Sequence, residues 1–97
     1  MYSPRTFLGG TGSLKKNLYT QRQSILLDLL RKTRKGAGLR QDDVAERLGR
    51  PQSFVSKYES GERRLDILEL YDVCEALGLV LSDFVEKLQT ILMDNKK

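Results

Sequence analysis

The sequence contains no histidine or tryptophan, and among its 97 residues there are one cysteine and two prolines. The absence of histidine excludes histidine-based catalytic triads, histidine general bases and Cys/His zinc sites. The single cysteine, Cys74, cannot form an intramolecular disulfide and is typical of a reducing compartment. We therefore expect a cytoplasmic protein that is not an enzyme and that holds no metal or other cofactor.

Long apolar runs are also absent, and the longest is Ile25-Leu26-Leu27. A membrane span needs about 20 apolar residues, and the N-terminus lacks the apolar segment of a signal peptide. The basic residues do not lie opposite an apolar face of one long helix, which argues against a membrane surface as a partner. With 39% hydrophobic and 31% charged residues, the chain has enough apolar surface for one small globular domain.

The charges are distributed unevenly along the chain. Residues 1–64 contain 14 Lys and Arg against 6 Asp and Glu, a net charge of +8, whereas residues 65–97 contain 3 against 7, a net charge of −4. A basic front half with an acidic rear is typical of a protein that turns one face toward a polyanion. An uneven but ordinary solvated surface is the alternative that the charges alone leave open.

The chain divides into an arm, a helical domain and a short tail. Residues 1–19 contain Pro4 and three of the eight glycines, so we expect a partly ordered arm without a helix or strand. Thr20 followed by Gln23 is a capping-box pattern, which predicts the start of the first helix. Apolar residues then recur at helical spacing, and no strand pattern is present. The expected fold is all-α with five helices, a domain over residues 20–93, a tail over 94–97, and helices near 20–36, 41–48, 51–59, 66–77 and 82–93.

Residues 41–59 have the spacing of two short helices that cross at a steep angle, with only a short turn between them. Such a crossing requires a small residue in the first helix, which Ala45 supplies, and a turn residue that tolerates positive φ, which Gly49 supplies. The second helix, in whose first turn Pro51 fits, must direct an apolar residue into the crossing, and Val55 meets that need. Together the three matches predict a helix-turn-helix.

The segments around this pair resemble the Cro/lambda-repressor-like, or xenobiotic-response-element-type, helix-turn-helix transcriptional regulators. The resemblance covers residues 24–88, and its strongest segments are GLRQ at 38–41, VAERLG at 44–49, SFVSKYESGERR at 53–64 and ALGL at 76–79. It implies five helices, the third of which reads base edges in the major groove of double-stranded DNA.

The resemblance also implies roles for three side chains, one near the end of each of the first and third helices and one at the start of the second. Gln41 would contact a phosphate from the start of the second helix. Arg34 would pair with Glu59 in a partly buried clamp that positions the reading helix. A free Arg34 that binds phosphate is the alternative.

The third helix has two distinct faces. Val55 and Tyr58, with Pro51, fall on one face and are expected in the core. The opposite face is polar, as suits a surface inserted into a major groove, although an ordinary solvated face would look the same. Phe54 lies between the faces, either as a half-buried packing residue or as a contact to a thymine methyl group. The predicted base-reading residues are Gln52, Ser53, Ser56 and Lys57, of which Gln52 suits adenine and Lys57 suits guanine.

Side chains beside this helix are candidates for phosphate contacts, which position a protein on DNA without reading sequence. Arg40 stands where the resembled family usually has a Ser or Thr N-cap, so a side-chain cap worth about 1 kcal/mol is lost and a cation is gained. The predicted phosphate-contacting residues are Arg40, Gln41, Arg50, Ser60, Arg63 and Arg64.

The fifth helix extends an apolar stripe beyond what one small core needs, at Leu81, Leu88, Ile91 and Leu92. One small module covers too little DNA for specific binding at physiological salt, whereas two copies about 34 Å apart would bind a palindromic site. We expect residues 80–93 to form a homodimer interface; the alternative is that this helix caps the core of a monomer.

The sequence therefore predicts a sequence-specific regulator of transcription, repressor-like, whose partner is double-stranded DNA. The alternative is a protein-interaction module, such as an antitoxin or controller, that neutralises or recruits a protein partner. A steeply salt-sensitive affinity for random duplex DNA favours the first interpretation.

Overall fold

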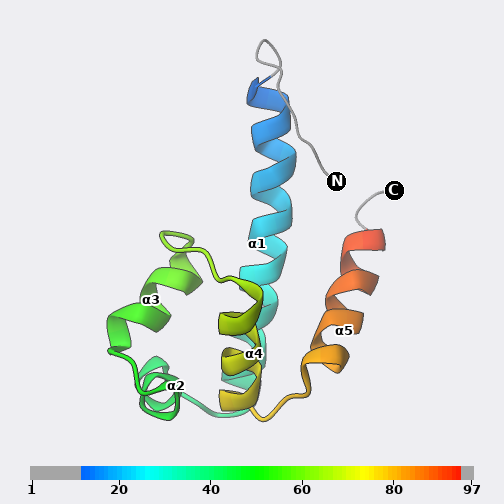
Figure 1. The fold of residues 1–97 in the computed structure, drawn as a ribbon. Helices are drawn as coiled ribbons and strands as arrows, with labels where there is room; N and C mark the ends of the chain where they lie inside the picture. Colours follow the sequence, from blue (N-terminus) through cyan, green and yellow to red (C-terminus); the bar gives the residue numbers. More distant parts are fainter. Residues whose placement is uncertain (1–11, 95–97) are drawn as a thin grey trace.

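The computed structural model describes residues 12–94, and this part of the chain consists of five α-helices and no strand (Figure 1). The all-α prediction is confirmed, and the second helix has the predicted bounds. Residues 1–11 of the predicted arm and 95–97 of the predicted tail lie outside the described residues. The helices are α1 Gly12–Gly36, α2 Gln41–Leu48, α3 Gln52–Ser60, α4 Ile67–Ala76 and α5 Leu81–Asp94.

The first helix starts earlier than expected. Since α1 begins at Gly12, the prediction of an arm without a helix is wrong for residues 12–19, and Thr20 marks no helix start. Pro4 and the three glycines of the predicted arm all lie at or before Gly12, whereas the segment SLKKNLY at 13–19 contains neither residue type. Leucine and lysine favour helix, so the helix extends back to the last glycine.

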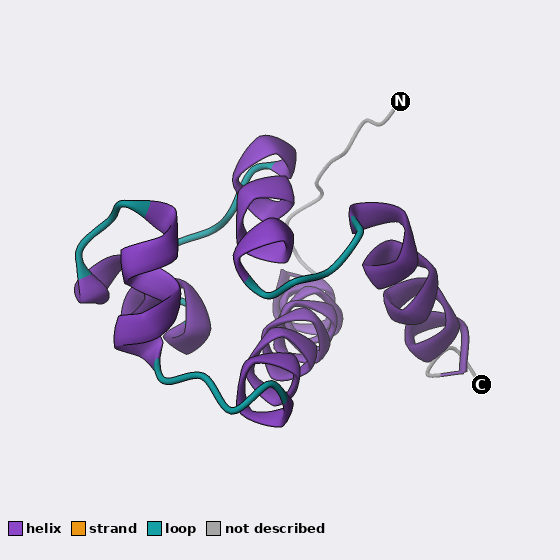
Figure 2. Cartoon of the chain, turned by 90° about the horizontal axis from the view of Figure 1, so that it is seen from below, coloured by secondary structure: helices purple, strands orange, loops and turns teal. Residues whose placement is uncertain are grey.

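Helices α2 to α5 are arranged around the C-terminal part of α1, and the N-terminal part of α1 extends beyond them (Figure 1). α3 and α5 both pack against α1, and α4 contacts α2 and α5. Figure 2, turned by 90°, shows α5 on one side of α1 and the α2–α3 pair on the other. The helix-turn-helix and the C-terminal helix therefore face different directions.

The core forms where α1, α2, α3, α4 and the first turns of α5 meet. Its centre is aliphatic, and Val44, Val55, Val73 and Cys74 are completely inaccessible to solvent. Burial of such side chains stabilises the fold by about 1.5–3 kcal/mol each. The remaining buried hydrophobic residues are Leu27, Leu30, Ala45, Phe54, Tyr58, Leu70, Ala76, Leu77 and Phe84.

The turn between α2 and α3 has the geometry that its sequence requires. Gly49 adopts φ 68°, in the left-handed region, and its N–H donates to the carbonyl of Glu46. Ala45 is 3% exposed and Val55 is fully buried, so the predicted small and apolar residues occupy the crossing. These three parts of the helix-turn-helix prediction are confirmed.

One prediction about α3 is wrong. Pro51 is exposed rather than in the core, because it is the N-cap of α3 and not part of its first turn. Its ψ of 153° is extended, so the helical spacing that places Val55 on the core face does not apply to Pro51.

Candidate nucleic-acid interface

α3 presents a polar face to solvent. Tyr58 anchors the opposite face in the core and is 1% exposed. The ammonium group of Lys57 is exposed and has no hydrogen-bond or ion-pair partner among the residues whose interactions the structure describes. Of the four predicted base-reading residues, Ser56 is partly buried and the others, Gln52, Ser53 and Lys57, are exposed.

Phe54 is a packing residue. It is 8% exposed, and its ring meets the ring of Tyr58 edge-on with the centroids 5.6 Å apart. The guanidinium groups of Arg50 and Arg63 lie 4.3 and 4.8 Å from the centroid of the Phe54 ring. Because neighbouring side chains cover the ring, the packing alternative for Phe54 describes the structure.

One edge of the polar face is held by a buried ion pair between α1 and α3. Arg34 Nε donates to Glu59 Oε2 at 2.7 Å, and Arg34 Nη2 donates to Glu59 Oε1 at 3.0 Å. The third guanidinium nitrogen donates to the carbonyl of Leu39 at 3.0 Å. Arg34 is 8% exposed and Glu59 is 4% exposed. The hydrogen bonds from Arg34 to Glu59 raise the pKa of the guanidinium, against the lowering effect of burial.

Two glutamine side chains connect this ion pair to the start of α3. Gln41 Nε2 donates to Glu59 Oε1 at 2.9 Å, and Gln52 Nε2 donates to Gln41 Oε1 at 2.7 Å. The chain of contacts fixes the orientation of the Gln52 amide, and an amide of this kind keeps one N–H and its carbonyl oxygen for further bonds. Gln41 and Gln52, predicted to contact a phosphate and a base, are therefore in contact with each other.

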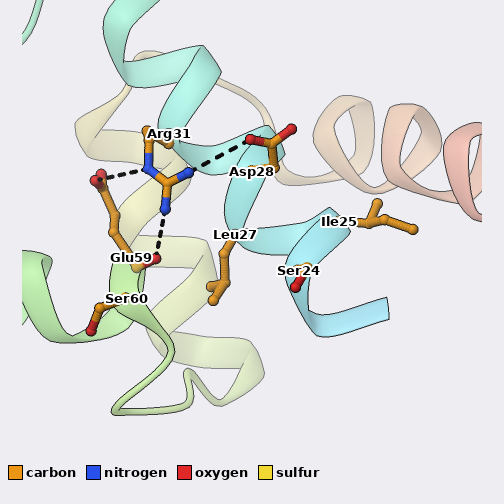
Figure 3. A pocket seen from close by; sticks show the side chains of 7 residues that line it. All are labelled: Ser24, Ile25, Leu27, Asp28, Arg31, Glu59 and Ser60. Atoms are coloured by element: carbon orange, nitrogen blue, oxygen red, sulfur yellow. Dashed lines mark hydrogen bonds and ion pairs between the residues drawn. The ribbon is translucent and has the colours of Figure 1, made fainter. Parts of the chain in front are cut away.

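Arg31, on α1, is a second arginine that contacts the end of α3, and it was not among the predicted site residues. Figure 3 shows Arg31 beside Glu59 and Asp28. Its Nη2 donates to the main-chain carbonyl of Glu59 at 2.9 Å, and its Nη1 lies 3.6 Å from Asp28 Oδ1. A cation at the C-terminus of a helix is favourable because of the helix dipole. The spacing of Asp28 and Arg31, three residues apart, is the only signal in the sequence.

The other edge of the polar face is a cluster around Glu69, a residue that was not among the predicted site residues. Arg63 Nη1 and Nη2 donate to Glu69 Oε1 and Oε2 at 3.0 and 2.7 Å, and Arg50 Nη2 lies 3.8 Å from Glu69 Oε2. Glu69 also accepts the N–H of Asp66 and thereby completes the capping box of α4. The bond from Arg63 is the largest influence that lowers the pKa of Glu69 to about 2. We call Arg50, Phe54, Arg63 and Glu69 the Glu69 cluster.

Arg40 is the N-cap residue of α2, and its side chain accepts no hydrogen bond from the N–H groups of the helix. Instead its N–H donates to Asp43 Oδ2 at 2.8 Å, and its guanidinium donates to both carboxylate oxygens of Asp43. These bonds lower the pKa of Asp43. Asp43, at the third helical position, thus supplies one of the two hydrogen bonds of a capping box, the one that accepts the N–H of the N-cap residue.

The remaining phosphate candidates follow α3. Ser60 is exposed; its hydroxyl donates to the carbonyl of Lys57 and accepts the N–H of Glu62. Arg64 is exposed as well. Of the six candidates, Gln41 contacts α3 through Gln52, while Arg40 pairs with Asp43 and both Arg50 and Arg63 pair with Glu69.

The described residues contain no group of three or more His, Cys, Asp and Glu side chains with the geometry to hold a metal ion. No helix within residues 12–94 is both long and apolar enough to cross a bilayer.

Comparison with known proteins places the chain among helix-turn-helix proteins. Residues 30–84 match the helix-turn-helix family HTH_3. An XRE-family-like protein from Pseudomonas syringae pv. tomato str. DC3000 is 45% identical, with a TM-score of 0.74, and the match covers 80% of this chain and 95% of that one. No protein of curated function matches the sequence.

Restriction-modification controllers have the same fold. The wild-type controller protein C.Esp1396I has a TM-score of 0.69 at 23% identity, over 75% of this chain and 95% of that one. A point mutant of the same controller gives a TM-score of 0.68 at 25% identity, over 74% and 91%.

Proposed function

The chain belongs to the Cro/C1-type helix-turn-helix family of DNA-binding transcriptional regulators, and on that premise we propose that it is a repressor that reads a palindromic operator as a homodimer. Its five helices form the lambda-repressor-like fold. The observation that carries the proposal is the exposed polar face of α3, which is held at both edges by side-chain contacts.

In this proposal α3 enters the major groove and reads base edges. Lys57 donates to guanine O6 or N7, since its ammonium group is exposed and has no described partner. Gln52 pairs with adenine through the carbonyl and the N–H that its bond to Gln41 leaves available. Ser53 and Ser56 are short enough to let the helix approach the bases and can donate or accept.

Phosphate contacts come from both edges of the polar face. The two DNA strands border the major groove. With α3 in the groove, one strand lies beside each edge of the polar face. Gln41 and Arg40 serve the strand near the start of α2, and Arg50, Arg63 and Arg64 serve the strand near the Glu69 cluster. Ser60, which lies beside Glu59 (Figure 3), contacts phosphate from the end of α3. The buried Arg34 supports α3 through Glu59 and is not itself a phosphate ligand.

The homodimer is proposed to form through α5. Leu88, Ile91 and Leu92 lie on one stripe of this helix and are only partly buried, while Met93 beside them is 58% exposed. Leu81 packs against the core of its own chain, so it contributes to the proposed interface less than the other three. Two copies joined along α5 would carry two α3 helices to two half-sites of a symmetric operator.

Selection of bound duplexes from a random library, followed by two variants, tests this function. We expect a palindromic consensus. Lys57→Ala should relax the preference at one base pair and cost about 1–3 kcal/mol against the best site. Arg63→Ala should weaken all sequences nearly equally and reduce the dependence of affinity on salt. An equal, sequence-independent loss in both variants would contradict the assignment of Lys57 as a reader.

A protein-interaction role is a second candidate, favoured by one specific observation. Ile67, Leu68 and Tyr71 on α4 are 60, 72 and 44% exposed, which is unusual for three large apolar neighbours. If this role is the main one, random duplex DNA should bind weakly and with little dependence on salt.

A further inference from the structure

The two edges of the α3 polar face differ in how accessible their charges are. At one edge, the side chains of Arg34 and Glu59 are 10 and 4% exposed, so a phosphate cannot reach this ion pair. In the Glu69 cluster the side chains of Arg50, Arg63 and Glu69 are 46, 39 and 17% exposed. A phosphate can therefore reach the cations of the Glu69 cluster.

The Glu69 cluster spans both ends of α3. Arg50 precedes the helix in the turn, Arg63 follows it in the loop, and both guanidinium groups lie against the ring of Phe54, which belongs to α3. One carboxylate serves two arginines, so the cluster has a net charge of +1 where the two arginines alone would have +2. Because the pKa of Glu69 is lowered to about 2, the carboxylate stays ionised at physiological pH.

We propose that Glu69 restrains Arg50 and Arg63 and so limits sequence-independent binding to DNA. This inference rests on the proposed function of α3 as a reader. A phosphate that approaches Arg63 must displace a carboxylate bound through two hydrogen bonds of 2.7 and 3.0 Å. Random duplex DNA offers only such phosphate contacts in return, whereas an operator adds base contacts to Gln52 and Lys57. Because random DNA is bound through phosphate contacts alone, this competition limits its binding directly.

The Glu69→Gln variant tests this proposal in the full chain. Glutamine keeps an oxygen that can accept the N–H of Asp66, so the capping box of α4 is preserved. The variant raises the net charge of the cluster from +1 to +2, which is equivalent to about one more neutralised phosphate. Such a change alters the slope of log affinity against log salt by about 0.9 and, at about 0.1 M salt, the affinity by about 5- to 10-fold. We expect Glu69→Gln to bind random duplex DNA tighter by that factor, with the steeper slope.

Two further variants separate restraint from a general change in charge. Glu75→Gln removes one negative charge from the same helix, where the carboxylate accepts only the Tyr71 hydroxyl, and should leave the slope unchanged. The double variant Arg63→Gln with Glu69→Gln restores the net charge of the wild type and should return the slope to its wild-type value. An unchanged or weaker affinity of Glu69→Gln, or an equal gain in Glu75→Gln, would overturn the proposal.

A measurement on the unaltered protein does not depend on how the variants fold. The NMR signal of the Arg63 guanidinium should shift when random duplex DNA binds, because the bond to Glu69 must open; an unshifted signal at saturation would contradict the proposal. A wild-type protein that does not bind DNA at all would instead contradict the proposed function, while wild-type binding with no effect of Glu69→Gln contradicts only this inference.

Discussion

Glu59 shows at the scale of a residue how one carboxylate organises an edge of the interface. Its carboxylate accepts from Arg34 and Gln41, and its main-chain carbonyl accepts from Arg31. Since Glu59 is 4% exposed, water cannot replace a lost partner. A buried pair with one partner removed leaves an uncompensated charge, which costs far more than a broken surface pair.

Glu59→Gln should therefore lower the free energy of unfolding by about 3–5 kcal/mol, because the Arg34 guanidinium stays buried without a counter-charge. Urea denaturation at neutral pH measures the change. The matched control is Glu62→Gln, an exposed position close to Glu59 along the chain, which should stay within about 0.5 kcal/mol of the wild type. A loss below about 1 kcal/mol in Glu59→Gln would show that the pair contributes little to stability.

The sequence allowed some of these contacts to be predicted and not others. Arg34 and Glu59 could be named because the resemblance supplies the pair. Arg31 and Glu69 could not, since their partners depend on how the end of α3 and the following loop turn back onto α1 and α4. Phe54 stayed ambiguous because helical spacing places it at the border of two faces, and its contacts with Tyr58, Arg50 and Arg63 in the fold decide which face it joins.

At the scale of an element, the start of α4 combines a helix cap with a charge cluster. Asp66 accepts the N–H of Glu69 at 2.7 Å, and Glu69 accepts the N–H of Asp66 at 3.0 Å. The same Glu69 carboxylate binds Arg63, which ties the loop after α3 to the first turn of α4. The cap is local in sequence and could be predicted from Asp66 and Glu69; the third partner is set by the loop and could not.

Low pH should destabilise the start of α4. The pKa of Glu69 falls from its ordinary value of 4.5 to about 2 in the folded chain, so its contribution to stability is complete above about pH 4.5 and is lost as the pH falls toward 2. Thermal unfolding midpoints of the wild type and Glu69→Gln, measured from pH 7 to pH 2, should differ most at the upper end and converge at the lower end. A difference that stays constant with pH would contradict the role of the ionised carboxylate.

At the scale of the whole molecule, the fold holds the acidic residues of the last helix apart from the helix-turn-helix, while Glu69, also from the acidic half of the sequence, lies beside it (Figure 1). The helix-turn-helix lies on one side of α1 and α5 on the other (Figure 1). The acidic residues of α5, Asp83, Glu86 and Asp94, are thus held away from the polar face of α3. This separation follows from the order of the helices, whereas the early start of α1 could not be predicted because the glycines of the arm dominated its composition.

Leu92→Lys should weaken the proposed homodimer. Burial of one leucine contributes about 2 kcal/mol, so we expect dimerisation at least about 30-fold weaker by sedimentation equilibrium. Thr90→Lys is the matched control, because Thr90 lies on the opposite, exposed side of α5, and it should stay dimeric. A wild type that is monomeric at micromolar concentration, alone and on operator DNA, would contradict the dimer.

The position of Cys74 gives the molecule a built-in reporter of its own opening. Its thiol is completely enclosed in the core, and burial raises the pKa of this thiol to about 11. Alkylating reagents attack only an accessible thiolate, so the closed molecule is protected twice. The chain has one thiol, so each covalent label corresponds to one opening event in which α4 separates from the core. The labelling rate therefore measures the frequency of local unfolding around α4.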